Sequence, residues 1–185
     1  MKGWIGFLLL IISHPLFSEV QYAQIRWNPA HCVNKCPETI AQQLKIFPGI
    51  ASLTMNPTAG QADLIWKPDV PFLVSYLANI FAQQRVTVYS IRIKVRGTIQ
   101  VFGNQVSLLS LGDNTTFSLV SAPKIQINRN QAYYNPANYP LDPYLKDQLA
   151  KAANEKKIVH IEGPLLAPDS ALSLMLIPQN VQQEP

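Results

Sequence analysis

The feature that most constrains the fold is a run of strand-like alternation from Tyr89 to Val101. Apolar residues fall on every second position of this run, with mostly polar residues between them. Because successive side chains of a strand point to opposite faces, the pattern predicts a strand with one apolar face. The run is longer than the strands of up to ~10 residues that are usual in globular proteins. We therefore expect it to be the last strand of one module and the first strand of the next.

Residues 20–93 predict an N-terminal module that ends on this run. Strand-like segments cover residues 22–27, 50–55 and 62–66. A first helix is predicted after Pro37, and a second after Asp69 and Pro71, which suit a helix cap and first turn. Apolar residues recur at helical spacing in both: Ile40, Leu44 and Phe47, then Leu73, Leu77, Ile80 and Phe81. The resulting order is that of a ferredoxin-like βαββαβ module.

Residues 94–178 predict a second module of short strands. The end of the long run is followed by strand-like segments at 105–111 and 115–120, a loop at 121–139 and a helix at 141–156. Two further strands are expected at 158–163 and 170–177, with Gly97 and Gly163 at bends. This order is that of a small OB-like β-barrel. The predicted fold class is therefore α+β, a ferredoxin-like module followed by a barrel, with a polar tail at 179–185.

The first eighteen residues have the features of a secretory signal peptide. Lys2 gives a positive start, Ile5–Ile12 is apolar, and Ser18 offers a small residue for cleavage. The apolar run is too short to span a bilayer, and no later run approaches ~18 apolar residues. We expect an exported protein, in a bacterial periplasm, that does not span the membrane once processed. Such a compartment is oxidising.

Charge and motifs narrow the function classes. The net charge is +4, and Arg92, Lys94 and Arg96 alternate along the long run, which favours a solvated strand face over a track for anions or nucleic acid. The strands of residues 94–120 carry two aromatic residues, few for a stacking platform. We find no glycine-rich phosphate loop, G-x-S-x-G or H-E-x-x-H motif. We expect no enzyme and no nucleic-acid partner, but a protein partner in the periplasm or envelope.

Both cysteines lie in one loop between a predicted strand and a predicted helix. Cys32 and Cys36 are separated by three residues, and His31 precedes the first of them. Two thiolates near a helix N-terminus can bind a soft ion such as Cu(I), with His31 as a third ligand. The same two cysteines can instead form a disulfide in an oxidising compartment. Thiol–disulfide exchange is a third interpretation, although the usual C-x-x-C motif is absent.

The N-terminal module also resembles a known family. Cys36, Ile40 and Leu44, the helix exit at 47–53 and the segment 60–66 are similar to the heavy-metal-associated domain of copper chaperones and metal-pumping ATPases. The resemblance implies a ferredoxin-like fold with two metal-binding cysteines. Cys36 matches the second ligand position, whereas Val33 occupies the first and Cys32 lies one residue earlier.

Three functions follow from these patterns. The first is soft-metal binding or transfer, with Cu(I) or another soft ion held by Cys32, Cys36 and His31. The second is a structural or protein-interaction module with a degenerate metal site and a Cys32–Cys36 disulfide. The third is thiol–disulfide exchange. In the barrel, Tyr133, Tyr134 and Tyr139 of the proline-rich loop form a candidate binding face, with a packed surface loop as the alternative.

Overall fold

The computed structural model describes residues 19–68, 70–123, 135–166 and 174–184, so the predicted signal peptide lies outside the described residues. Among the described residues it has three α-helices and nine β-strands, which confirms the α+β class. The elements are β1 (Val20–Trp27), α1 (Cys36–Ile46), β2 (Ile50–Asn56), β3 (Gln61–Trp66), α2 (Val74–Gln83), β4 (Val88–Phe102), β5 (Gln105–Ser110), β6 (Thr116–Leu119), α3 (Pro143–Asn154), β7 (Ile158–Leu166), β8 (Leu174–Leu176) and β9 (Asn180–Gln183). Two short 3-10 turns cover Pro29–His31 and Pro136–Asn138.

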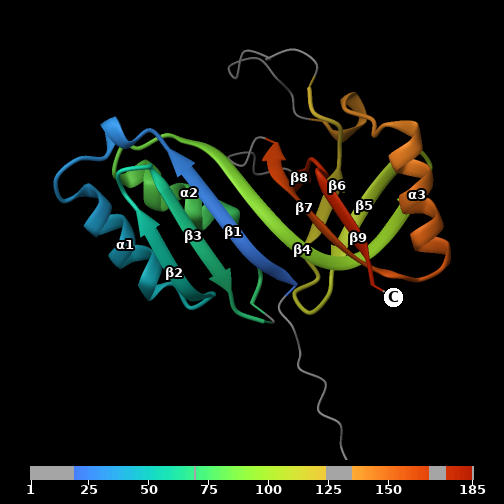
Figure 1. Ribbon diagram of the computed structural model, residues 1–185, viewed down its shortest axis with the longest axis horizontal. Coiled ribbons are helices and arrows are strands. Elements are labelled where there is room, and N and C mark those ends of the chain that lie inside the picture. Colours follow the sequence, from blue (N-terminus) through green and yellow to red (C-terminus); the bar gives the residue numbers. More distant parts are fainter. Residues whose placement is uncertain (1–18, 69, 124–134, 167–173, 185) are drawn as a thin grey trace, which may run out of the picture.

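The N-terminal half is an antiparallel sheet with the strand order β2-β3-β1-β4. Helices α1 and α2 lie on one side of it (Figure 1). Ile40 and Leu44 of α1 are buried, as their spacing predicted, and Pro37 with Glu38 occupies the first turn. Helix α2 begins at Val74, later than predicted, so Leu73 precedes the helix and is exposed instead of belonging to its apolar stripe. Asp69, the expected cap, lies outside the described residues.

Strand β4 is the long strand that the alternation predicted, and it joins the two halves of the molecule (Figure 1). Its first half pairs with β1, its second half pairs with β5, and β7 pairs along its middle. Residues 92–95 pair with β1 and β7 at once, so these two strands lie on opposite edges of β4. Strand β4 therefore belongs both to the N-terminal sheet and to the β-structure of the C-terminal half.

The C-terminal half is a closed barrel of five strands. The pairs are β4–β5, β5–β6, β6–β8, β8–β7 and β7–β4, of which β6–β8 is parallel and the others are antiparallel. Gly97 and Gly163 lie where another backbone comes close: a Cβ on them would lie 2.3 Å from the Leu109 carbonyl oxygen and 1.8 Å from that of Ile177. Glycine at these positions lets the neighbouring chain segments approach each other.

One large hydrophobic core runs through both halves, beside a small second cluster in the barrel. Buried residues of α1, α2 and the N-terminal sheet belong to the same cluster as those of the barrel. Aromatic rings bridge the junction, since Phe72 contacts Trp66 at a centroid distance of 5.0 Å and Phe117 at 6.4 Å. The Phe72 amide also donates to the Asp113 carboxylate of the β5–β6 turn at 3.2 Å. The two halves therefore share packing as well as a strand.

The C-terminal residues are a strand and not a free polar tail. Asn180–Gln183 form β9, which pairs with β7, and their polar composition gave no sequence signal for a strand. Glu184 follows β9 and accepts hydrogen bonds from the Arg96 guanidinium at 2.7 and 3.1 Å. His160 Nε2 lies 2.8 Å from the same carboxylate. These contacts attach the end of the chain to β4 and β7.

This attachment predicts a loss of stability in acid. The hydrogen bond from Arg96, supported by His160, lowers the pKa of Glu184 from 4.5 to about 2. Because the folded-state pKa is depressed, the contribution of Glu184 to stability is complete above pH 4.5 and disappears as the pH falls toward about 2. We expect the melting temperature of Glu184→Gln to fall less than that of wild type when the pH is lowered over this range. Glu155→Gln, which removes an exposed ion pair with Lys157, should change it little; equal effects of both variants would contradict the prediction.

Candidate functional site: the cysteine loop and the barrel cavity

The cysteine loop is built on a buried strand end. Trp27, the last residue of β1, is buried, and its amide donates to the Gly60 carbonyl at 2.9 Å. The Asn28 side chain then accepts from the Ala30 amide at 3.0 Å and starts the 3-10 turn that contains His31. Cys32 follows and is only 4% exposed. The sequence thus places one cysteine in the core and leaves the histidine at the surface.

Cys32 and Cys36 form a disulfide, with their Cα atoms 5.2 Å apart. This confirms the predicted disulfide alternative. Both sulfur atoms are engaged, so in this state neither is a thiolate that could bind a soft ion. In the described part of the chain, no group of three or more histidine, cysteine, aspartate or glutamate side chains could hold a metal ion. The disulfide closes the loop covalently at the start of α1.

We expect this link to contribute about 2 kcal/mol to the free energy of unfolding, the chain-entropy value for so short a loop. Cys32→Ala with Cys36→Ala, or reduction of the wild type, should each lower stability by that amount in urea denaturation. Reductant added to the double variant serves as the control and should change nothing further. A wild type that is equally stable with and without reductant would show that the disulfide is idle.

The second candidate site is a cavity of about 640 Å³ at one end of the barrel. Its floor is made by the buried side chains of Val106, Leu119, Tyr139 and Leu141. Polar groups and prolines form its rim: Asn104, Gln105, Ser118, Pro136, Pro140, Pro143, Lys146 and Asp147. The volume lies in the range of about 300–1,000 Å³ that is typical of ligand sites.

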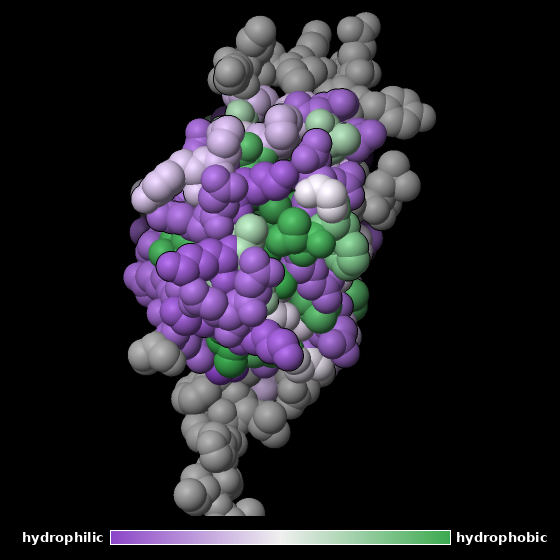
Figure 2. Space-filling model, turned by 90° about the vertical axis from the view of Figure 1, so that its right-hand side faces the viewer, coloured by the Kyte–Doolittle hydropathy of each residue, from purple (hydrophilic) through white to green (hydrophobic). Residues whose placement is uncertain are grey.

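The β4–β5 turn and helix α3 meet at this cavity. The turn supplies Asn104, whose side-chain oxygen accepts from Lys146 Nζ of α3 at 3.1 Å. Asp142 caps the start of α3 by accepting from the Tyr144 and Leu145 amides at 3.0 and 3.4 Å. Viewed from the α3 side, apolar surface is gathered beside a broad hydrophilic area (Figure 2).

The three predicted tyrosines have different outcomes. Tyr133 and Tyr134 lie outside the described residues. Tyr139 is buried, packs in a small cluster with Val120 and Met175, and lines the cavity. Tyr139 is therefore part of the cavity floor, and its role in binding stays a prediction. The sequence did not predict that Asn104 and Lys146 line a cavity together. No sequence pattern shows that a turn will pack beside a helix about forty residues later in the chain.

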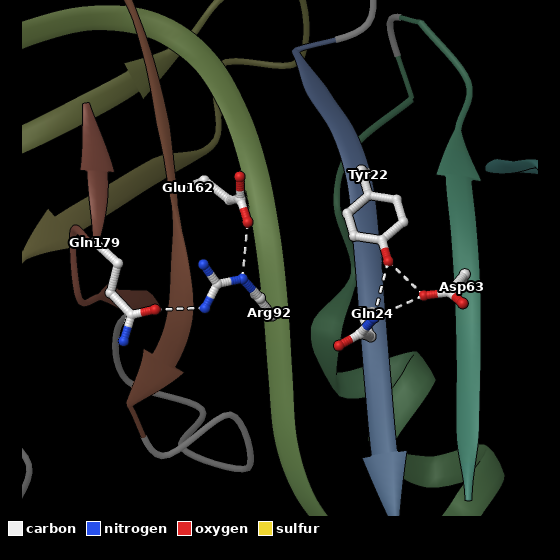
Figure 3. A network of polar contacts seen from close by, with 6 residues as sticks. All are labelled: Tyr22, Gln24, Asp63, Arg92, Glu162 and Gln179. Carbon is white, nitrogen blue, oxygen red and sulfur yellow. Dashed lines mark hydrogen bonds and ion pairs between the residues drawn. The ribbon is translucent and has the colours of Figure 1, made fainter. Parts of the chain in front are cut away.

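A polar network on the open face of the sheet was also missed. Tyr22 and Gln24 of β1 both hydrogen-bond to the Asp63 carboxylate of β3, with Gln24 Nε2 at 2.9 Å (Figure 3). Beside them, Arg92 Nε of β4 donates to Glu162 of β7 at 2.8 Å and another of its nitrogens donates to Gln179 (Figure 3). The only sequence signal was polar residues at alternate strand positions.

The electrostatics of this network are those of a satisfied structural cluster. Burial and the hydrogen bond to Asp63 raise the pKa of Tyr22 to about 12, so the phenol stays protonated. Burial acts to raise the pKa of Asp63, but hydrogen bonds from Tyr22, Gln24 and Gln61 bring it below its ordinary value. A protonated donor thus faces an ionised acceptor. The cluster ties β1 to β3 and offers no group poised for acid–base chemistry near pH 7.

The chain was compared with protein-family models, curated proteins and solved structures. No match was found in any of the three. The resemblance to the heavy-metal-associated domain therefore has no support beyond the residues that suggested it. None of the three described helices has the length and apolar character of a membrane-spanning helix.

Proposed function

We propose that the chain is an exported, non-enzymatic binding protein that acts as a protein-interaction module in the periplasm or envelope. The Cys32–Cys36 disulfide carries this proposal, because it engages both candidate metal ligands in the oxidation state expected outside the cytoplasm. The loop then supports the fold, as in the degenerate-site alternative. The cavity of the barrel is then the proposed site that recognises the protein partner.

The finer fold assignments belong to the same proposal. The order of elements in residues 20–93, with strands arranged β2-β3-β1-β4, supports a ferredoxin-like module. The closed five-strand barrel, with α3 between its third and fourth strands in chain order, supports an OB-like assignment. Neither fold implies a function by itself, so the proposed role depends on the two sites.

The cavity suits an apolar side chain presented by a protein partner. Its floor is apolar and buried, and its rim carries an ammonium at Lys146 and a carboxylate at Asp147. An apolar floor inside a polar rim is the usual arrangement around an anchor residue of a protein interface. Rim prolines reduce the conformational entropy that binding would cost.

Site-specific photo-crosslinking in cells tests this proposal. A photoreactive residue at Ala137, an exposed residue that lines the cavity, should give one defined adduct with an envelope protein. The same residue at Glu155, at the far end of α3, is the matched control and should give none. The adduct should persist when both cysteines are replaced by alanine. No adduct at Ala137, or equal adducts at both positions, would refute recognition at the cavity.

Cu(I) binding is the second candidate function, favoured because both sulfur atoms and His31 lie in one loop and Cys36 begins α1, where a thiolate is stabilised. It requires reduction. A Cu(I) titration of the reduced protein against a competing chelator, with Cys36→Ser alongside, decides between these possibilities. One equivalent bound by wild type and lost in the variant supports a metal site.

Thiol–disulfide exchange is the third candidate function. It would instead show a reduction potential of the Cys32–Cys36 pair near those of exchange catalysts.

A further inference from the structure

The outermost strand of the N-terminal sheet has a free edge. In the described part of the chain, β2 pairs with β3 and with no other strand. Its other edge therefore presents backbone N–H and C=O groups that no neighbouring strand binds. Figure 1 shows β2 and α1 together along the outer side of this half of the molecule. An edge of this kind is a template for pairing with another strand.

The two outer strands of the sheet differ in how they are protected. Strand β9 is four residues long, and side chains on both sides of it, Gln179 and Glu184, are bound to arginines of β4. Strand β2 is seven residues long and contains neither a charged residue nor a proline. Short length, charge and proline are among the devices by which proteins block their sheet edges, and a β-bulge is another. Strand β2 uses none of the first three, and its one irregularity is a register shift between Ile50 and Ser52, near its start.

We propose that β2 pairs antiparallel with β2 of a second copy of this chain, which extends the sheet across a two-fold axis. An uncharged strand meets its own copy without like charges in register. Leu53 and Met55 are half-buried on the side of the core, so a second copy would cover their remaining apolar surface. Two backbones in register would satisfy each other's free groups.

Helix α1 favours a copy of the chain as the occupant of this edge. It contacts β2 and carries Glu38 in its first turn and Lys45 in its last turn. A two-fold axis reverses the helix of the second copy, so each Glu38 would lie toward the partner's Lys45 and opposite charges would meet at both ends. Ile46, at the end of α1, is 77% exposed and adds apolar surface beside this joint. The proposal does not rest on the cavity or on the cysteines.

Sedimentation equilibrium of the purified chain tests the proposal. Wild type should sediment as twice the mass of a single chain, which is 20.7 kDa before the predicted signal peptide is removed, at about 100 µM, where a micromolar dissociation constant leaves few single chains. Ser52→Lys with Thr54→Lys should weaken association at least about tenfold, because lysines of the two copies would face each other. Both side chains are exposed, so the fold of the single chain should be retained, as circular dichroism would verify.

The matched control places two lysines on the other outer strand. Asn180→Lys with Gln182→Lys uses exposed positions of β9 and should leave the dissociation constant unchanged. A wild type that stays a single chain at the highest concentration overturns the proposal. So does a dimer that survives the β2 substitutions, or one that both pairs of lysines weaken equally, because association would then use another surface.

Discussion

Gly163→Ala is expected to lower the free energy of unfolding by about 3–5 kcal/mol, the cost of overpacking together with two weakened hydrogen bonds. Its Cβ would lie 1.8 Å from the Ile177 carbonyl oxygen, a backbone atom that no rotamer change can move. Hydrogen bonds on either side, Ile177 N to the Pro164 carbonyl and Gln179 N to the Glu162 carbonyl, hold the two segments together. Urea denaturation measures the loss.

The control for this prediction is another glycine substitution. Gly103 in the β4–β5 turn has a φ of +59°, and a Cβ added to it would have no neighbouring atom within 4 Å. Gly103→Ala should therefore cost only the ~1–2 kcal/mol of a left-handed backbone with a side chain. If Gly163→Ala cost no more than Gly103→Ala, the close contact between β7 and the segment after β8 would not matter for stability.

Phe117→Ala is expected to cost about 3–5 kcal/mol, as for other buried phenylalanines. Phe117 belongs to the barrel, is fully buried and contacts Phe72, which in turn contacts Trp66 of the N-terminal sheet. Because the core is continuous, the loss should appear in both halves. Fluorescence of Trp27 and Trp66 should therefore report the same lowered transition as far-ultraviolet circular dichroism.

Phe102→Ala provides the matched control for this second prediction. Phe102 lies at the end of β4 and is 68% exposed, so its loss should change stability by no more than about 0.5 kcal/mol. The contradicting result is a tryptophan-fluorescence transition with the wild-type midpoint in Phe117→Ala, together with a circular-dichroism transition whose midpoint is lower. The two halves would then unfold independently, contrary to the shared core.

Much of the fold was predictable because its signals are local. The alternation through Ile91 and Val95 defined β4, and the spacing of Ile40 and Leu44 defined α1. The barrel followed from the order of short strands. Gly97 and Gly163 were expected at bends, and the structure shows that another backbone segment comes close to each. Strand β9 was missed because its polar residues have no apolar face; pairing with β7 alone makes them a strand.

The candidate site was less predictable for a physical reason. The spacing of Cys32 and Cys36 permits a metal site or a disulfide, and the sequence alone left both open. The disulfide in the structure resolves which bond is present, but the function of the loop stays a proposal. The cavity depends on contacts such as Lys146 with Asn104, which arise only when α3 packs against the barrel. Long-range contacts of this kind leave no periodic trace in a sequence.

The length of β4 also sets a distance between the two candidate sites. Val88, where β4 begins, is paired with Trp27 beside the cysteine loop, whereas the turn after Phe102 carries Asn104 at the cavity. At about 3.3 Å per residue, the strand between them has a contour length of roughly 45 Å. One small molecule cannot touch both places. A partner that contacts both must itself be the size of a protein domain. Its contact surface would have to extend from the cysteine loop to the cavity at the other end of β4.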